Sequence, residues 1–270
     1  MKRLIFAAAL LLSLHLSAQP LATPAPPDAA LEQAVGAQLP LDLPLGESDG
    51  HAVRLGDYFT ADRTVLVVPG YYTCPQLCGL LMHGLLEAAR AAGLGADEVR
   101  IVGISIDPQD TPETARHRLD ADLGYARFLR GERRETLPDL HLLVGDAGAI
   151  SRFAQAVGLR FSALNGDAAS RFAHPASVIV ATPQGRISRY LPGIRFDAAE
   201  LRDAVKAARD ARIGAPSSGL ALLCAHFDPQ WGRHTSLVMN GLRAVGLLLA
   251  ATLAAWCWRR REIISGSRSR

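Results

Sequence analysis

Short apolar runs alternate with amphipathic stretches along the middle of the chain. Five runs predict buried strands, at residues 64–69, 99–106, 140–144, 177–181 and 186–191. Helical periodicity predicts helices that end near residue 92, begin at residue 111, and cover residues 147–157 and 197–212. A hairpin is predicted at residues 41–45 and 52–55, around Asp49 and Gly50. This order of elements predicts an α/β fold, in which a central sheet is flanked by helices on both faces.

The amino-terminal end has the pattern of a secretory signal peptide. Lys2 and Arg3 precede an apolar run at residues 4–16, and the small residues Ser17 and Ala18 follow it. The run is too short to span a bilayer comfortably, because a spanning helix needs about 20 apolar residues.

The carboxy-terminal end predicts a single transmembrane helix at residues 237–258. Its strongly polar residues, Asn240 and Arg243, lie near its start, and arginines follow it at residues 259–261. Positive residues stay cytoplasmic, so the domain before the helix is predicted to lie outside the cytoplasm. The alternative is an amphipathic helix packed on the domain.

These patterns divide the chain into six segments. They are a signal peptide at residues 1–18, a linker at 19–38, a domain at 39–213, a juxtamembrane segment at 214–236, the transmembrane helix at 237–258 and a cytoplasmic basic tail at 259–270. The whole chain has a formal net charge of +3, whereas residues 19–236 hold 21 Lys and Arg against 25 Asp and Glu. A mildly acidic domain without a basic stripe argues against nucleic acid as a partner.

The most informative segment is the sequence YTCPQLC at residues 72–78. It follows the first predicted buried strand, and open α/β sheets place their sites at the carboxyl ends of such strands. Pro75 suits a first helical turn, so Cys74 is predicted at a helix N-terminus and Cys78 one turn later, with both sulfurs on one face. The helix dipole there favours thiolate, the form that binds metals and attacks disulfides.

Two cysteines four residues apart leave a metal site incomplete, and His174 is the best candidate for a third ligand. It lies ahead of a predicted strand, in a loop that can fold back beside the cysteines. Two sulfurs and an imidazole favour copper, particularly Cu(I), whereas zinc usually requires a fourth ligand. The structural alternative is a disulfide between Cys74 and Cys78, since one helical turn permits a bridge.

Four features follow one another between about residues 41 and 212. They are the CPQLC turn at residues 74–78 after a buried strand, the sequence IDPQDTP at 106–112, His174 before a strand, and the PQG turn at 183–185 followed by SRY at 188–190. In this order they resemble the Sco/SenC family of copper-binding cytochrome c oxidase assembly proteins. The resemblance implies a thioredoxin-like fold and the copper ligands Cys74, Cys78 and His174, with the cysteines as a redox pair. It also implies the copper-bearing subunit of cytochrome c oxidase and other periplasmic copper or thiol redox proteins as partners.

The sequence departs from the common pattern of that family in two places. Gly79 follows the second cysteine where many members have proline, and PGYY at residues 69–72 replaces the usual FGYT. The cysteine spacing is kept.

Other candidate residues have two or more interpretations. Asp107 and Asp110 are interpreted either as groups that support the site or as turn and cap residues. Cys224 and His226 could form a second metal site or an intermolecular cysteine, or belong to a docking segment. The tyrosines at positions 71 and 72 either wall the site or pack in the core.

The sequence therefore predicts a copper chaperone and thiol redox protein that assists assembly of the copper centre of a respiratory cytochrome c oxidase. Reduced thiolates with neutral His174 would bind copper, and oxidation to a disulfide would release it. One alternative is a metal-independent thiol–disulfide oxidoreductase, although the usual redox signature is Cys-x-x-Cys. Others are an interaction domain with relic cysteines and a peroxidase, the latter on fold alone.

Overall fold

The computed structural model of the chain describes residues 29–74, 77–131, 137–163 and 171–216, together with Val245, Gly246 and Thr252. The predicted signal peptide, Cys224, His226 and nearly all of the predicted transmembrane helix lie outside these residues. The three isolated residues are helical and exposed. Among the helices within the described ranges, none combines the length and hydropathy needed to cross a membrane.

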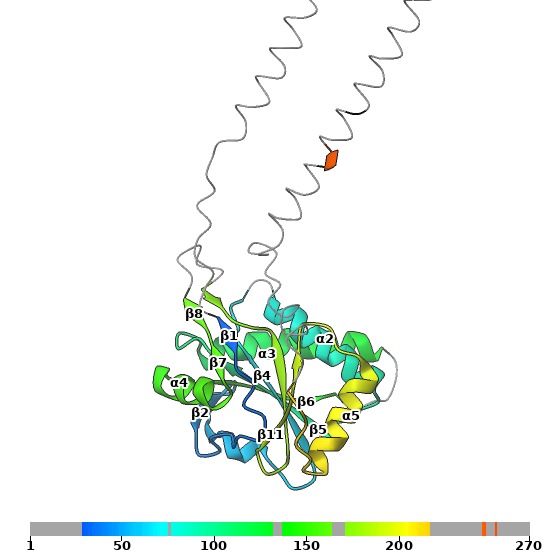
Figure 1. Cartoon of the computed structure of the whole chain (residues 1–270). Helices are drawn as coiled ribbons and strands as arrows, with labels where there is room; N and C mark the ends of the chain where they lie inside the picture. The colour runs from blue at the N-terminus through cyan, green and yellow to red at the C-terminus, as the bar shows by residue number, and fades with distance from the viewer. Residues whose placement is uncertain are drawn as a thin grey trace, which may run out of the picture.

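A mixed sheet forms the centre of the molecule (Figure 1). Its strands are β2 (Pro44–Glu47), β3 (Ala52–Arg54), β4 (Thr64–Gly70), β5 (Val99–Ser105), β6 (Asp139–Val144), β10 (Ser177–Ala181) and β11 (Ile187–Pro192). They lie in the order β11-β10-β4-β5-β6-β2-β3. The central strands β4, β5 and β6 pair in parallel, and the strands on both sides of them pair antiparallel. The predicted buried strands are confirmed, and β10 has the predicted bounds.

Four helices cover the sheet, with small paired strands at its edge. The helices are α2 (Leu77–Ala91), α3 (Pro112–Arg130), α4 (Ala147–Ala156) and α5 (Ala198–Arg209). The short elements are β1 (Ala30–Leu31) with β7 (Leu159–Arg160), β8 (Ser162–Ala163) with β9 (Phe172–Ala173), and the 3-10 turn η1 (Leu55–Tyr58). These short strands were absent from the prediction, because two residues carry no measurable period.

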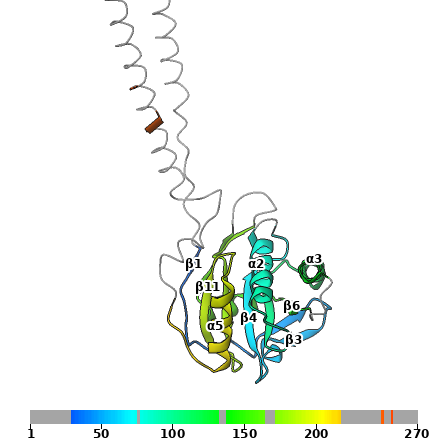
Figure 2. The ribbon, with the colours of Figure 1, turned by 90° about the vertical axis from the view of Figure 1, so that its right-hand side faces the viewer.

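Helix starts follow from local chemistry. Thr111 caps α3 by accepting the Thr114 N–H at 3.3 Å, with Pro112 in the first turn. Asp146 and Asp197 cap α4 and α5 in the same way. Apolar cores lie on both faces of the sheet, one beneath α2, α3 and α5 and the other beneath α4. Figure 1 shows α4 on the opposite side from α2 and α5, and in Figure 2 α2 and α5 face the viewer. The predicted sheet with helices on both faces is confirmed.

A polar network joins β2 to β6 and β5 in the sheet. The His141 ring lies 2.5 Å from Glu47 Oε1 through Nδ1 and 2.8 Å from Asp139 Oδ1 through Nε2. Arg100 donates from Nε to Asp139 at 2.7 Å. These side chains are less than one-third exposed, so their ion pairs are shielded from solvent more than ordinary surface pairs.

We expect the free energy of unfolding to fall less steeply at acidic pH in Asp139→Asn than in the wild type. Burial raises the pKa of Asp139, but hydrogen bonds from Arg100 and His141 outweigh it and lower the pKa below the usual 3.8. A carboxylate with a lowered folded-state pKa stabilises the fold above its unfolded pKa, and the contribution is lost as the pH falls through the folded value. Urea unfolding at several pH values between about 6 and 3 should therefore show that the variant loses less unfolding free energy per pH unit than the wild type. Equal slopes would contradict this.

Candidate metal and thiol site

Both candidate cysteines lie where β4 passes into α2. After Gly70 the chain turns, and the Cys74 N–H donates to the Tyr71 carbonyl at 3.3 Å. Cys78 is the second described residue of α2, and Cys74 precedes the described part of the helix. The predicted role of Pro75 lies outside the described residues. A methyl group added at Gly70 would be 3.5 Å from Cys78 Sγ, so the sulfur packs directly over this backbone.

His174 lies directly after β9 and meets Cys78. Its Nε2 atom is 3.6 Å from Cys78 Sγ, and its Nδ1 atom is 3.2 Å from the Pro175 carbonyl oxygen. A carbonyl only accepts hydrogen bonds, so the ring proton of a neutral imidazole belongs on Nδ1. The lone pair of Nε2 is then directed toward the sulfur. The prediction that this loop folds back beside the cysteines is confirmed.

Sheet topology explains why residues so far apart in sequence meet. β4 runs directly into the cysteine turn, and β10 begins shortly after His174. The two strands pair antiparallel, with Ile179 opposite Val67. The carboxyl end of β4 therefore lies beside the amino end of β10. This places the loop that carries His174 (the histidine loop) over the turn after Gly70 that carries Cys74 (the cysteine turn).

The environment favours uncharged forms of these side chains. A hydrogen bond with Cys74, and then burial, raise the pKa of Cys78 well above its usual value. Burial lowers the pKa of His174, more than the nearby Cys74 raises it. The expectation that a helix dipole would favour thiolate is therefore wrong for Cys78 in the metal-free chain, because desolvation and the neighbouring sulfur dominate.

Aromatic side chains line one side of the site. Tyr71 is 3% exposed, and its ring centroid lies 6.0 Å from that of His174 and 5.7 Å from that of Phe172. Tyr72 has a different role, since its hydroxyl lies 3.1 Å from the Gly103 carbonyl oxygen and 2.6 Å from that of Leu143. Tyr71 thus walls the site, while Tyr72 ties the cysteine turn to the sheet.

The two aspartates after β5 support the cysteine turn. Asp110 Oδ2 accepts the Tyr72 N–H at 2.8 Å and the Ser105 hydroxyl at 2.6 Å. Asp107 accepts the Gln109 N–H at 2.8 Å, as a turn residue does, and forms an ion pair with Arg171. Asp107 thus fits both interpretations, and Asp110 supports the turn while Thr111 acts as the cap.

Two arginines near the site were missed from the sequence. Arg171 precedes β9 and reaches the cysteine turn. Arg118 on α3 pairs with Asp122 at 2.9 Å, and its guanidinium lies 3.4 Å from the position of a methyl group added at Gly79. Gly79 therefore makes room for a cation beside the start of α2. Single arginines in amphipathic or loop segments carry no signal of such contacts.

The donor atoms are only partly assembled. Within the described ranges, no three His, Cys, Asp or Glu side chains are arranged to hold a metal ion as they stand. Cys78 and His174 form a close pair, and Cys74 is a hydrogen-bond neighbour of Cys78. Cys74 and Cys78 are not joined by a disulfide.

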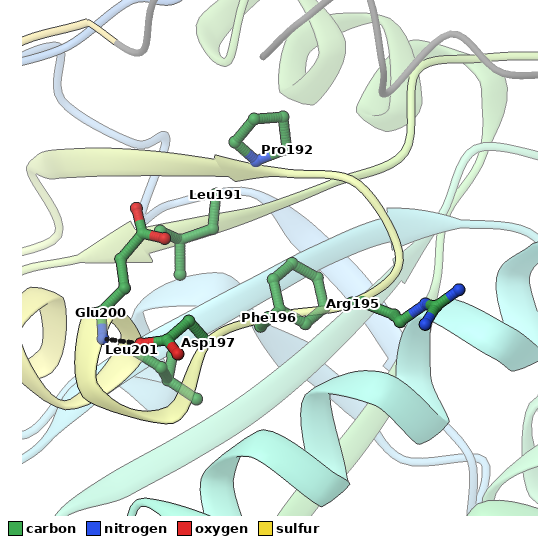
Figure 3. Close-up of a pocket in the computed structure, with 7 residues that line it drawn as sticks. All are labelled: Leu191, Pro192, Arg195, Phe196, Asp197, Glu200 and Leu201. Atoms are coloured by element: carbon green, nitrogen blue, oxygen red, sulfur yellow. Dashed lines mark hydrogen bonds between the residues drawn. The ribbon is translucent and has the colours of Figure 1, made fainter.

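A small pocket lies elsewhere, between the end of β11 and the start of α5 (Figure 3). Its volume is about 40 Å³, which is room for little more than ordered water. The Asp197 carboxylate at its edge accepts the Glu200 N–H at 2.9 Å as part of the helix cap. This pocket takes no part in the cysteine site.

A cysteine turn that follows a central parallel strand, in a mixed sheet covered on both faces, defines a thioredoxin-like domain with a thiol site. The chain belongs to the SCO1/SenC family, whose model matches residues 44–209. The resemblance drawn from the sequence is therefore confirmed at the level of the family.

Solved structures support the fold. A candidate electron transfer protein from Aquifex aeolicus VF5 is 21% identical, with a TM-score of 0.56, and the match covers 66% of this chain and 95% of that one. Arabidopsis thaliana ScoI, solved with copper bound, is 19% identical, with a TM-score of 0.51 and coverage of 66% and 99%. No curated protein matches the chain.

Proposed function

We propose that this protein is a copper-binding, thiol redox assembly factor for a respiratory cytochrome c oxidase, and that copper is its cargo. Cys74, Cys78 and His174 are the proposed ligands. The observation that carries the proposal is the 3.6 Å separation of Cys78 Sγ and His174 Nε2. Metal–sulfur and metal–nitrogen bonds of about 2.3 and 2.0 Å would place the two donors about 3.5–3.7 Å apart, for angles between tetrahedral and trigonal.

The donor chemistry selects the metal. Two thiolates and one imidazole are soft to intermediate ligands, which favour Cu(I) over hard cations. Because ligands must be deprotonated, binding the metal would release the thiol protons, and it would reverse the preference of Cys78 for the neutral form. The Arabidopsis relative was solved with copper bound, which supports the same metal here.

Thiol oxidation offers a way to release the metal. A disulfide on a partner protein, attacked by one thiolate and resolved by the other, would be reduced to two thiols while Cys74 and Cys78 become a disulfide. Two electrons pass to the partner, whose two sulfurs take their protons from solvent, and the copper loses two ligands. The raised pKa of Cys78 keeps that thiol neutral in the metal-free chain and leaves Cys74 as the attacking thiolate in this exchange.

The proposed location follows from the chain ends. A signal peptide at residues 1–18 and a single helix at residues 237–258 would hold the domain on the periplasmic side of the cytoplasmic membrane. An oxidase subunit in the same bilayer would then be the partner at high effective concentration. Protease treatment of intact spheroplasts should remove the domain if this orientation is right, and its protection would overturn it.

Copper titration tests the proposed function. We expect the purified full-length chain, reduced, to bind one Cu(I) in competition with a chromogenic chelator. The disulfide form and His174→Ala should bind at least about 100-fold more weakly, because each lacks ligands. A reduced chain that binds copper no better than a Cys74→Ser/Cys78→Ser double variant would overturn the proposal. Full oxidase assembly by His174→Ala would favour the metal-independent thiol role instead.

A further inference from the structure

The guanidinium of Arg171 connects the loop that carries His174 to the cysteine turn and to the turn after β5. Arg171 Nη2 donates to Thr73 Oγ1 at 3.1 Å, next to Cys74. The same group forms an ion pair with Asp107, and Nη1 donates to Gln109 Oε1. Both of these residues belong to the turn after β5.

We propose that Arg171 is a positioning residue that holds His174 against the cysteine turn. This inference rests on the proposed copper site and extends it to a residue outside the ligand set. Arg171 lies three residues before His174, with only the two-residue strand β9 between them. Because an extended residue spans at most about 3.6 Å, fixing Arg171 restricts where the imidazole can lie.

The anchor for Arg171 is itself rigid. Asp107 is 1% exposed, and the Gln109 N–H holds its other oxygen at 2.8 Å. A buried carboxylate that loses its cationic partner is costly, so the pair resists separation. A guanidinium suits this role because its planar fork serves several acceptors at once, which a lysine ammonium on a flexible stem does less well.

The other side of the histidine loop is held by packing. Phe172 lies edge-on to Tyr71, with ring centroids 5.7 Å apart, and Phe172 also contacts Phe161 at 5.7 Å. These contacts fix the apolar face of β9, and Arg171 fixes its polar start. Without the arginine, the segment would keep its packing but lose its tie to the cysteine turn.

A double-variant experiment tests whether Arg171 acts through His174. We expect Arg171→Ala to weaken Cu(I) binding by the full-length chain about 10-fold, the lower end of the effect of groups that orient metal ligands. In the His174→Ala background the same change should have no further effect. Arg171→Lys should lie between wild type and Arg171→Ala, because it keeps the charge but not the fork.

Arg152→Ala is the matched control. Arg152 on α4 donates to Asp42 at 3.0 Å, and both side chains of this ion pair are more than half exposed. The Arg152→Ala variant should leave the affinity for Cu(I) unchanged. A loss in Arg171→Ala that is equally large in the His174→Ala background would overturn the proposal, because the arginine would then act on the cysteines or on the fold.

A metal-free readout separates this inference from the proposed function. Ring protons of selectively labelled Tyr71 and His174 should show a nuclear Overhauser effect in the wild type, since their centroids are 6.0 Å apart. We expect the effect to weaken in Arg171→Ala and to persist in Arg152→Ala. If it persists in both, the inference is wrong whether or not copper binds. If wild type binds no copper but the effect weakens as expected, only the proposed function fails.

Discussion

Replacing Cys78 with serine should lower the affinity of the reduced chain for Cu(I) by about 1,000-fold or more if Cys78 is a ligand as proposed, because a hydroxyl is a hard and rarely deprotonated donor. Among the proposed ligands, Cys78 has the most fixed position. It lies in α2, packs over Gly70 and faces His174 at 3.6 Å. Competition with a Cu(I) chelator at constant pH measures the change.

Cys257→Ser is the control for this variant. The chain has four cysteines, and Cys257 belongs to the predicted transmembrane segment, so its loss should leave affinity unchanged. If Cys78→Ser retains affinity within about 10-fold of the wild type, the sulfur does not bind the metal. The pairing with His174 would then have another purpose, such as a hydrogen bond that only fixes the loop.

A second large effect is expected at Gly84, in the middle of α2. A methyl group there would overlap the carbonyl oxygen of Ile194, in the loop between β11 and α5. Backbone cannot move aside as easily as a side-chain end, so Gly84→Ala should destabilise the fold by about 1–3 kcal/mol. The displaced loop also borders α5, so the helix packing on that face would loosen.

Gly124 in α3 provides a control of opposite sign. A methyl group at Gly124 meets no atom within 4 Å, so Gly124→Ala should stabilise the chain by about 0.5–1 kcal/mol through helix propensity alone. Urea unfolding of both variants measures the difference. Equal effects at the two glycines would show that Ile194 yields without cost.

Sequence patterns predicted most of the fold because a strand that is buried on both faces appears in the sequence as a continuous apolar run. The continuous apolar runs became β4, β5, β6 and β10, whose two faces are both covered. The position of His174 beside Cys78 was predicted from strand order. This worked because the placement depends on topology, which the alternation of strands and helices indicates.

The remaining features could not be predicted, for a different physical reason. The ion pair of Arg171 with Asp107 and the pairing of His141 with Glu47 join distant segments, and so does the approach of Arg118 to Gly79. Such contacts have no periodicity in the sequence. The preferred protonation of Cys78 was also missed. It depends on how deeply the sulfur is desolvated and how close Cys74 lies, and neither follows from a cysteine's position near a helix start.

The pairing of β10 with β4 also sets an order of events during biogenesis. Cys78 and His174 are 96 residues apart in the chain, and they become neighbours only when the two strands join. A polypeptide in which β10 has not yet paired with β4 would have the sulfurs without the imidazole beside them. Under the proposed function, tight binding of copper would therefore follow this pairing and would act as a test of correct folding.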